Sequence, residues 1–488
     1  MNIASALSIA VALQPEAIAI EDGKEQWSYA QLAWMVDADI ALLAEHGVVP
    51  GDVVTLMQVP SPAQIAWLLA ATALGAVANP INYRLKAPEI AGLLTASGAS
   101  VVVCDSRYDQ LCRGLGPQLT VLPTESGGPA GEAAELTYAE RSDELPAVMI
   151  FTSGTTGVPK PVYFSHVALL EYLYSSATPP EIGSTECSVV CVPCYHVAGL
   201  TAVLASLYSG RRIRTLGAFS CAEWTNAVSD GAATHCFLVP TMLKEVVDDP
   251  AFDPSRLVSL QTLAYGAGPM PRSVIVKAME CFPPSTGFVN AYGLTEAGGV
   301  VSMLLPDDHR EAFAGQTHEV RARLNSVGRA APGAELRIAP QVAGERVGQV
   351  EVRRDALEWI ESGDLGYLDE EGYLFLVGRA VDRIVRGGEN IDPVEIEEAL
   401  RECEGIVDAA VVGRQDERWG EVVVAFVVTK PDQPTIDTDQ LETQLRSKLS
   451  SYKVPEEFRL IETLPRNGLG KVLKPELRSK LSVVDQQP

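Results

Sequence analysis

The loop FTSGTTGVPKPV at residues 151–162 combines four hydroxyl side chains, two glycines and one lysine. Hydroxyl groups and glycine amides donate hydrogen bonds to anions, and a lysine adds a point charge suited to phosphate oxygens. The spacing differs from the common phosphate loop, in which four residues separate the glycines and Gly-Lys-Ser/Thr ends the motif. Phosphate binding and a flexible polar turn are both open interpretations. The strand-like AVMI before the loop favours phosphate binding.

Other apolar runs also end in small or polar residues. Examples are THCFLVPTML, SLQTLAYGAG and GFVNAYGLTEAGG. Sites in α/β sheets lie just beyond the C-terminal ends of the strands. The residues that follow these runs are therefore candidates for the same site as the loop.

The elements that position these residues indicate an α/β protein. Residues 1–145 alternate helix-like runs with short apolar runs, which predicts a parallel sheet covered by helices. From about residue 326 short β segments with frequent turns follow, and the tail indicates a small α+β unit whose first helix begins at Asp392 and Pro393. We predict a large N-terminal domain over 1–379, with parallel-rich sheets layered with helices and a β-rich subdomain. A small mobile C-terminal α+β domain over 380–488 completes the chain.

The composition excludes some classes of function. The net charge of −25 argues against a general nucleic-acid surface, because phosphate backbones are bound by an excess of Lys and Arg. The N-terminus lacks a basic region before its apolar run, and the most apolar stretches are too short or too interrupted to cross a bilayer. We therefore expect a cytoplasmic protein with no membrane partner and no nucleic-acid partner.

One cluster of cysteines needs a choice between two interpretations. Cys187, Cys191, Cys194 and His196 lie close together in the sequence and could form a zinc site or a redox pair. The run CSVVCVPCYHVAGL is, however, continuously apolar and β-branched, which favours a buried strand with small hydrophobic thiols.

Six motifs together resemble a known family. FTSGTTGVPK is similar to the phosphate loop of the adenylate-forming superfamily, which includes acyl- and aryl-CoA synthetases, luciferases and peptide-synthetase adenylation domains. PCYHVAGL (193–200), YGAGPM (265–270), NAYGLTEAG (290–298), the stretch 362–397 and PRNGLGKVLK (465–474) resemble further motifs of this family. Their order and spacing cover nearly the whole chain. The chain is thereby identified as a member of the acyl-/aryl-CoA synthetase branch.

The resemblance implies a ligase that uses ATP, Mg²⁺ and coenzyme A. A carboxylic acid attacks the α-phosphate of ATP, expels pyrophosphate and becomes an acyl-adenylate, and a thiol then displaces AMP. The first step brings two anions together, so it needs cations and donors aimed at the developing charge. By resemblance, the residues that contact ATP or AMP are Thr152, Ser153, Gly154, Thr155, Thr156, Gly157, Lys160, Gly266, Ala267, Gly268, Asn290, Ala291, Tyr292, Gly293, Thr295, Asp364 and Arg379.

Within this set the resemblance implies individual roles. Thr295 contacts the α-phosphate, and Glu296 ligates Mg²⁺, a hard cation that prefers oxygen. Tyr292 stacks on adenine. Asp364 accepts hydrogen bonds from the ribose hydroxyls, since a carboxylate has acceptors enough for both, and Arg379 adds a second ribose contact.

The C-terminal motifs imply a second set of roles. Lys471 is the adenylation lysine between the carboxylate and the α-phosphate. Asp382 is the hinge about which the C-terminal domain rotates between the two reactions. The residues implied for the path of coenzyme A are Arg386, Gly387, Gly388 and Glu389. Because these residues are present, we expect both half-reactions to be competent.

The acid itself is defined only as a class. The residues implied for the acyl pocket are Tyr195, His196, Val197, Gly199, Gly268 and Gly298. No carboxylate accompanies Tyr195 and His196, which argues against an amino-acid substrate. His196 either gates the carbonyl and thiol path or is a core histidine bonded to backbone. The small residues predict room for a bulky apolar, aromatic or polycyclic acid.

Three points stay open from the sequence. Pro161 stands where the family usually has glycine, and the lost N–H predicts altered loop mobility rather than loss of ATP binding. The thiol acceptor is free coenzyme A or a carrier-protein thiol. A non-catalytic adenylate-binding protein is disfavoured by the presence of Lys471 and Glu296, and the resemblance leaves a homodimer open.

Overall fold

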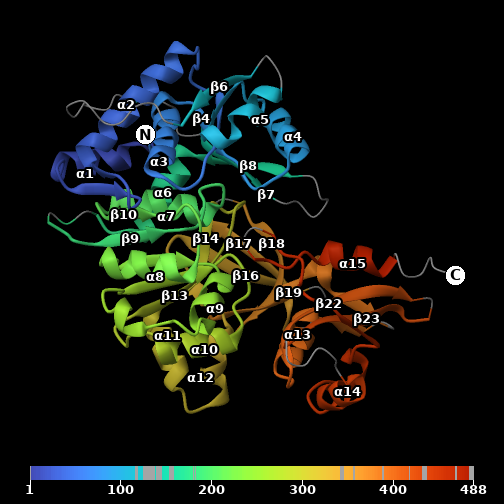
Figure 1. Ribbon diagram of the computed structural model, residues 1–488. Helices are drawn as coiled ribbons and strands as arrows, with labels where there is room; N and C mark the ends of the chain where they lie inside the picture. The colour runs from blue at the N-terminus through green and yellow to red at the C-terminus, as the bar shows by residue number, and fades with distance from the viewer. Residues whose placement is uncertain are drawn as a thin grey trace.

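The computed structural model shows four sheets arranged in two domains (Figure 1). It describes residues 2–115, 119–124, 138, 145–152, 159–179, 181, 183–340, 346–354, 358–386, 389–416, 418–430, 437–467 and 470–482. The loop residues Ser153, Gly154, Thr155, Thr156 and Gly157, and also Gly387 and Gly388, lie outside these described residues.

The largest sheet has nine strands in the order β15-β14-β13-β12-β11-β9-β10-β1-β2. Neighbouring strands from β1 through β10, β9, β11 and β12 to β13 pair in parallel, as the alternating pattern predicted. The C-terminal ends of β12 and β13 carry the two motifs around residues 266 and 294. The strand bounds are β1 Ile18–Glu21, β2 Gln26–Ser28, β9 Cys187–Val190, β10 Arg212–Thr215, β11 His235–Leu238, β12 Thr262–Gly266, β13 Gly287–Leu294, β14 Gly299–Leu304 and β15 Arg329–Ala330.

A second sheet of six strands has the order β6-β5-β3-β4-β7-β8 and is also mainly parallel. Its edge strand β8 pairs antiparallel with β7, so Thr152 and Lys160, which flank the predicted phosphate loop, lie on adjacent strands. The bounds are β3 Val53–Met57, β4 Val77–Pro80, β5 Val101–Cys104, β6 Thr120–Pro123, β7 Pro146–Thr152 and β8 Lys160–Ser165.

Helices separate and cover these two sheets. The largest apolar cluster joins α1, α2, α3 and α7 to strands of both sheets, through buried residues such as Trp67 and Leu204. The bounds in this domain are α1 Ser5–Leu13, α2 Tyr29–Glu45, α3 Pro62–Leu74, α4 Ala87–Ser97, α5 Asp109–Gly114, α6 His166–Ser176, α7 Val197–Tyr208, α8 Cys221–Asp230, α9 Pro240–Asp248, α10 Arg272–Cys281, α11 Pro306–Ala314 and α12 His318–Ala322. Among the helices that the structure describes, none is both long and apolar enough to cross a lipid bilayer.

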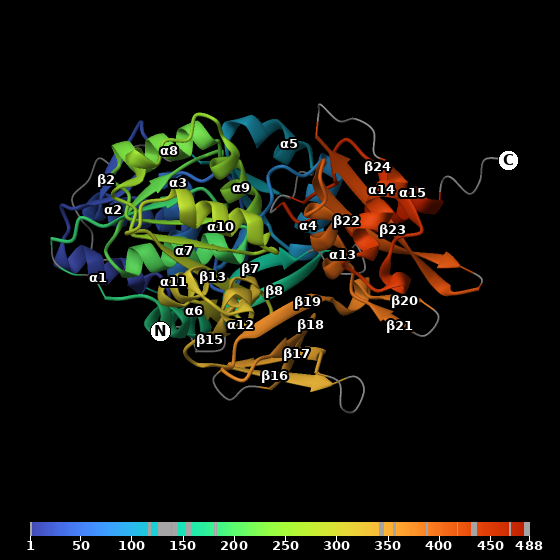
Figure 2. The ribbon, with the colours of Figure 1, turned by 90° about the horizontal axis from the view of Figure 1, so that it is seen from below.

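The β-rich subdomain is a four-stranded antiparallel sheet in the order β16-β17-β18-β19. Figure 2 shows its last strands leading toward the C-terminal domain. The bounds are β16 Ala334–Pro340, β17 Gly348–Arg354, β18 Ile360–Leu368 and β19 Leu374–Arg379. Asp364 on β18 and Arg379 at the end of β19 are register partners, so the hairpin brings them together.

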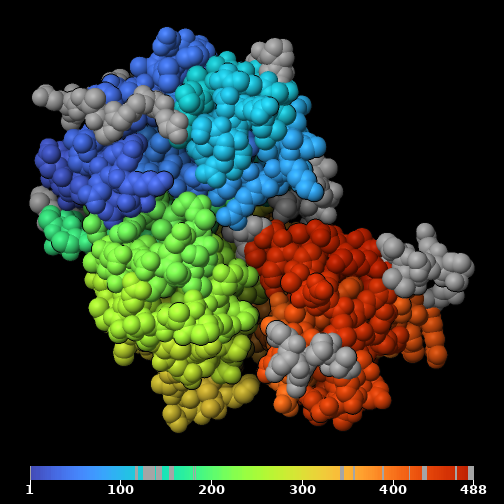
Figure 3. Space-filling model, in the orientation of Figure 1, coloured from blue at the N-terminus to red at the C-terminus, as the bar shows by residue number. Residues whose placement is uncertain are grey.

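The C-terminal domain has its own apolar core and forms a separate lobe beside the N-terminal domain (Figure 3). Its sheet has the order β21-β20-β23-β22, with β24 parallel to β23. The bounds are β20 Ile384–Arg386, β21 Glu389–Ile391, β22 Ile406–Asp416, β23 Gly420–Thr429, β24 Glu457–Leu460, α13 Pro393–Arg401, α14 Thr438–Arg446 and α15 Lys474–Ser482.

Helix α13 begins at the residue that the sequence predicts, but the Asp392 side chain does not play the predicted capping role. The helix begins at Pro393 after Asp392, as predicted. The Asp392 side chain does not cap the helix, and it pairs instead with Arg383, whose Nε lies 2.9 Å from Oδ1. An ion pair to a preceding residue has therefore replaced the expected bond to the helix N–H groups.

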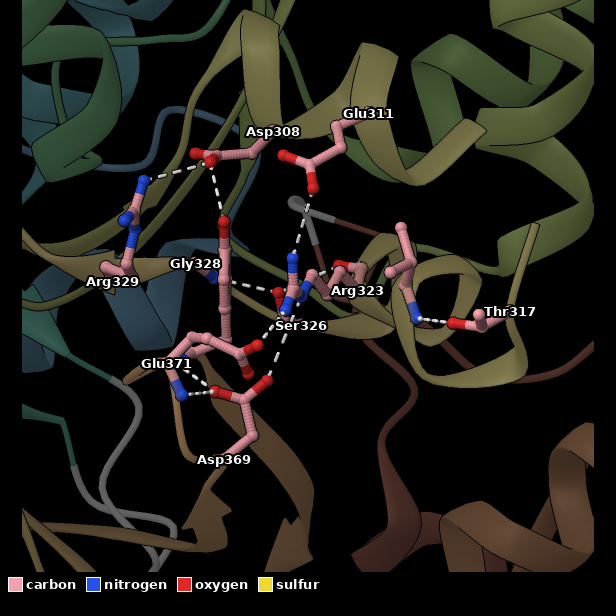
Figure 4. A network of polar contacts seen from close by, with 11 residues as sticks. Asp308, Glu311, Thr317, Arg323, Ser326, Gly328, Arg329, Asp369 and Glu371 are labelled. Atoms are coloured by element: carbon pink, nitrogen blue, oxygen red, sulfur yellow. Dashed lines mark hydrogen bonds and ion pairs between the residues drawn. The ribbon is translucent and has the colours of Figure 1, made fainter. Parts of the chain in front are cut away.

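A polar network attaches the β18–β19 turn to the nine-stranded sheet (Figure 4). Arg323, whose side chain is only 11% exposed, lies 2.8 Å from a Glu371 oxygen and 3.5 Å from Glu311. Its guanidinium also stacks on Tyr373, 4.7 Å from the ring centre. Asp308 adds a hydrogen bond from the Tyr373 hydroxyl at 2.7 Å. The network fixes the hairpin that carries Asp364 and Arg379.

Replacing Arg323 with glutamine is expected to lower the free energy of unfolding by about 1–2 kcal/mol, because the carboxylates lose their central cation. The glutamates are more than half exposed, which keeps the effect below that of a fully buried pair. Chemical denaturation measures it. The control is Arg310→Gln, since Arg310 pairs with the almost fully exposed Asp307 and should change stability very little. Equal effects in the two variants would contradict the role of Arg323.

Candidate active site

The described residues that flank the predicted phosphate loop lie opposite each other on adjacent strands. Thr152 ends β7, Lys160 begins β8, and the two residues are register partners. The Lys160 side chain is exposed, so its charge is free to meet a phosphate. Pro161 is opposite Phe151 on the edge strand β8, a position where proline is compatible with a sheet. The predicted effect of Pro161 on loop mobility stays a prediction.

Tyr292, Asp364 and Arg379 form the centre of the site. The Tyr292 hydroxyl donates to Asp364 Oδ2 at 2.7 Å, and Arg379 Nη1 donates to Oδ1 at 3.0 Å. Burial, followed by the charge of the Asp364 carboxylate, raises the pKa of Tyr292, so the hydroxyl remains a donor. Asp364 is 8% exposed, and its N–H is bonded to Ser362 Oγ. Three sequence-predicted residues thus meet, from a strand of the large sheet and from the β18–β19 hairpin.

Lys471 reaches the same place from the C-terminal domain. Its N–H donates to Asn467 Oδ1 at 2.9 Å, and Asn467 N–H donates to the Lys471 carbonyl at 2.9 Å, which closes a tight turn. The residue is exposed to solvent, but neighbouring protein atoms partly desolvate its ammonium group. This desolvation, and then the charge of Arg379, lower its pKa, whereas Asp364 acts in the opposite direction. Lys471 therefore lies within electrostatic range of the Asp364–Arg379 pair.

The turn that carries Lys471 packs directly on the N-terminal domain. Gly470 has φ +74°, and a Cβ placed there would lie 2.4 Å from the side chain of Thr241 on α9. Any larger residue at 470 would push the turn away from α9. A cavity of about 330 Å³ beside this contact is lined by Thr241, Lys244, Glu245, Asp408, Arg466 and Gly470. The small size of Gly470 thus allows the turn that carries Lys471 to lie close to α9.

The lowered pKa of Lys471 predicts a pH effect on the first half-reaction. The resemblance implies that the charged ammonium of Lys471 is the form that serves adenylation, so its loss as pH rises should slow this step. Because the pKa lies below the usual 10.5, this alkaline limb should begin at a lower pH than for an ordinary lysine. Adenylation rates measured from neutral to alkaline pH test this. Lys471→Arg should move the limb upward, and an unchanged profile in that variant would assign the limb to another group.

The turn between β13 and β14 holds the predicted phosphate and metal residues. Thr295 is half-buried and Glu296 is exposed, and Glu296 takes part in none of the ion pairs among the described residues. A free carboxylate at a turn fits a hard cation. Asn290, in contrast, is buried and donates to the Ser326 carbonyl at 3.2 Å, so its amide supports the strand.

Tyr195 and His196 lie between the two sheets at the start of α7. Tyr195 packs edge-on against Tyr83, with ring centres 5.6 Å apart. Burial, and then the charge of Arg84, lower the pKa of His196 to about 4, so the imidazole is neutral at physiological pH. Among the described residues, neither the Tyr195 hydroxyl nor His196 Nε2 has a hydrogen-bond partner. These buried polar atoms suit contact with a ligand group or water better than a core histidine bonded to backbone.

The cysteines near His196 lie in the apolar interior. Cys187 begins strand β9, and Cys191 and Cys194 follow it, all of them buried. Burial raises the pKa of the Cys191 and Cys194 thiols to about 12. Within the described ranges, no group of three or more His, Cys, Asp or Glu side chains is placed to hold a metal ion. The thiols pack as small hydrophobic side chains.

The resemblance assigns three glycines to the acyl pocket, and the structure gives a different reason for glycine at each of them. A Cβ at Gly199 would lie 2.3 Å from the Pro193 carbonyl oxygen, so this glycine permits close packing of backbone. At Gly268 a Cβ would meet nothing closer than 3.8 Å, whereas Gly298 has φ +76°, a left-handed backbone that favours glycine whatever the space around it. Of these three glycines, only Gly268 therefore supports the expectation of a roomy pocket. Gly199 does not.

The described part of the implied thiol path lies on the C-terminal domain. Arg386 ends β20, where it pairs with Glu456 and donates to the Tyr452 carbonyl at 2.9 Å. Glu389 begins β21 and is exposed. Asp382, the predicted hinge residue, pairs with Arg478 of α15 at 2.8 Å.

Sequence reasoning missed two arginines near the site. Arg84 follows β4 closely enough to affect His196, and the rule that sites lie beyond strand ends could have found it. Arg478 lies in a helix near the C-terminus, with no local pattern that points to the hinge. Its pairing depends on tertiary contact alone.

Comparison with known proteins identifies the family of this chain. A model of the AMP-binding enzyme family matches residues 7–357, and a model of the AMP-binding enzyme C-terminal domain matches residues 395–471. The chain therefore belongs to the AMP-binding enzyme family. Within it, the chain is an acid–thiol ligase of the AMP-forming acyl-CoA synthetase branch.

Named relatives illustrate this branch. The chain is 33% identical over 484 residues to a feruloyl-CoA synthase from an Amycolatopsis species, covering 96% of each protein. It is 30% identical to a fatty acid–[acyl-carrier-protein] ligase from Streptomyces coeruleorubidus, covering 90% of this chain and 88% of the relative. The structure of o-succinylbenzoate CoA synthetase from Bacillus subtilis with its acyl-adenylate superposes with a TM-score of 0.84, at 25% identity over 97% of this chain and 98% of that one.

Proposed function

We propose that this protein is an ATP-dependent carboxylic acid–CoA ligase that works in two steps. Acid and ATP give acyl-adenylate and pyrophosphate, and coenzyme A then gives the thioester and AMP. One observation carries the proposal most: Lys471 of the C-terminal domain lies in the field of Asp364 and Arg379, which belong to the N-terminal domain. A cation there is suited to a reaction between two anions.

The described residues divide the work of the first step. Asp364 has two carboxylate oxygens to hold the ribose hydroxyls, and Arg379 keeps that carboxylate oriented. Tyr292 offers its ring to adenine. Lys160 and Thr152 hold the outer phosphates, and Lys471 offsets the repulsion between carboxylate and α-phosphate. Glu296 would hold Mg²⁺, which would supply further positive charge to the phosphates.

The second step requires another arrangement of the same two domains. In the proposal, the chain turns at Asp382, so that the C-terminal domain beyond this residue rotates relative to the domain over 1–379, withdraws Lys471 and brings residues 386–389 to the site. Separate apolar cores in the two domains support such movement, because neither core must open.

An aromatic or otherwise bulky acid is the proposed substrate class. The feruloyl-CoA synthase relative supports an aromatic acid, and the open space at Gly268 is consistent with it. Tyr195 and His196 supply neutral polar atoms rather than a carboxylate, which disfavours an amino acid. The relative that loads an acyl carrier protein keeps a carrier thiol as the alternative acceptor.

A panel of acids tests the function. Pyrophosphate release is measured with ferulic acid, o-succinylbenzoic acid, a long-chain fatty acid, acetate and phenylalanine, with and without coenzyme A. The expected result is activity with a bulky acid and AMP formation that depends on coenzyme A. Full turnover that needs a carrier protein instead would favour the alternative. Pyrophosphate release with phenylalanine, and with none of the other acids in the panel, would overturn the proposed substrate class.

A further inference from the structure

The chain passes between the two domains along a single short segment. Strand β19 ends at Arg379, residues Ala380–Asp382 form a 3-10 turn, and β20 of the C-terminal sheet begins at Ile384. Val381 in this segment is 62% exposed, so its side chain contributes little packing. The orientation of the two domains must therefore be fixed by contacts from outside the segment.

Arg478 of α15 supplies such a contact. Its Nη2 donates to Asp382 Oδ1 at 2.8 Å and, more weakly, to the Val381 carbonyl at 3.5 Å. The Val381 carbonyl lies on the N-terminal side of the proposed hinge residue Asp382, whereas helix α15 lies on its C-terminal side. Rotation about the backbone of Asp382 changes the position of that carbonyl relative to α15. The pair of contacts is therefore specific to the present arrangement of the domains.

The same arrangement places Lys471 in the site. Gly470 packs on Thr241, and Lys471 lies near Asp364 and Arg379. Helix α15 begins at Lys474, directly after the lysine turn, so α15 and the turn move together. A contact that holds α15 on Asp382 also holds Lys471 at the site.

We infer that Arg478 is a positioning residue whose pairing with Asp382 stabilises the adenylating arrangement and sets the balance between the two half-reactions. The inference rests on the proposed two-step function. When the C-terminal domain rotates, Arg478 releases Asp382 and Val381, and the loss of these contacts is part of the free-energy difference between the arrangements.

A distance measurement tests the inference without any acid. Nitroxide labels are attached at Val258→Cys in the N-terminal domain and Leu460→Cys in the C-terminal domain, which are 71% and 53% exposed. Cys221 and Cys281 are replaced by serine, because the other seven cysteines are buried. Arg478→Gln should shift the population away from the present distance by about 3- to 10-fold, as for a partly exposed charged pair. Arg478→Lys should restore part of it.

The matched control is Arg414→Gln. Arg414 pairs with Glu457 at 3.0 Å inside the C-terminal domain, and its side chain is 31% exposed, close to the 35% of Arg478. It should leave the distance distribution unchanged. If Arg478→Gln matches this control, with and without Mg²⁺ and ATP, the inference is overturned.

Kinetics supply a second readout. With the acid found in the panel, Arg478→Gln should lower adenylation relative to thioester formation from supplied acyl-adenylate by a similar factor. Equal losses in both reactions would indicate a purely structural role and overturn the inference. If no acid is adenylated by the unmodified protein, the proposed function fails, and the label distances still decide the role of Arg478.

Discussion

Replacing Lys471 with alanine is expected to lower the rate of acyl-adenylate formation by about 10²- to 10³-fold, as for the loss of one donor to a developing charge. The acid carboxylate and the α-phosphate repel each other as they approach, and Lys471 is the cation that the C-terminal domain brings beside Asp364 and Arg379. Single-turnover pyrophosphate release measures the effect, using the best acid of the panel.

The second half-reaction supplies the control for Lys471. Thioester formation from supplied acyl-adenylate and coenzyme A should stay close to that of the unmodified protein, because the proposal withdraws the lysine in that step. Lys480→Ala, at an exposed lysine of α15, should leave both reactions unchanged. An equal loss in both half-reactions of Lys471→Ala would rule out the account with two domain arrangements.

Replacing Asp364 with alanine is expected to raise the KM for ATP by about 10- to 100-fold, the range for a lost hydrogen bond to a charged group. The change removes the proposed ribose acceptor and leaves the Tyr292 hydroxyl and the Arg379 guanidinium without their carboxylate. A smaller loss of stability, about 1–2 kcal/mol, should accompany it. The KM in pyrophosphate release and the midpoint of chemical denaturation separate the two effects.

Two further variants serve as comparisons for Asp364→Ala. Tyr292→Phe keeps the ring and removes one bond to the carboxylate, so it should raise the KM for ATP much less. Asp307→Ala removes a carboxylate that is almost fully exposed and should change neither quantity. A normal KM for ATP in Asp364→Ala would refute the ribose role, even if the protein were less stable.

Much of the fold follows from local patterns. The alternation of helix-like runs with apolar runs corresponds to two mainly parallel sheets covered by helices. Periodicity and turn residues act within a few positions, so they are visible in sequence. Where a prediction depended on a side-chain partner, it was less secure, since Asp392 pairs with Arg383 rather than capping α13.

For the candidate site, too, local patterns predicted some features and contacts between distant segments decided others. By itself, the sequence determined the family motifs and the residue types that suit phosphate, ribose and a developing charge. Only the tertiary structure decided that Lys471 comes within electrostatic range of the Asp364–Arg379 pair and that Arg478 holds Asp382. The physical reason is that these contacts join segments distant in the chain. They arise when separately packed cores dock, and no local pattern encodes the way two domains dock.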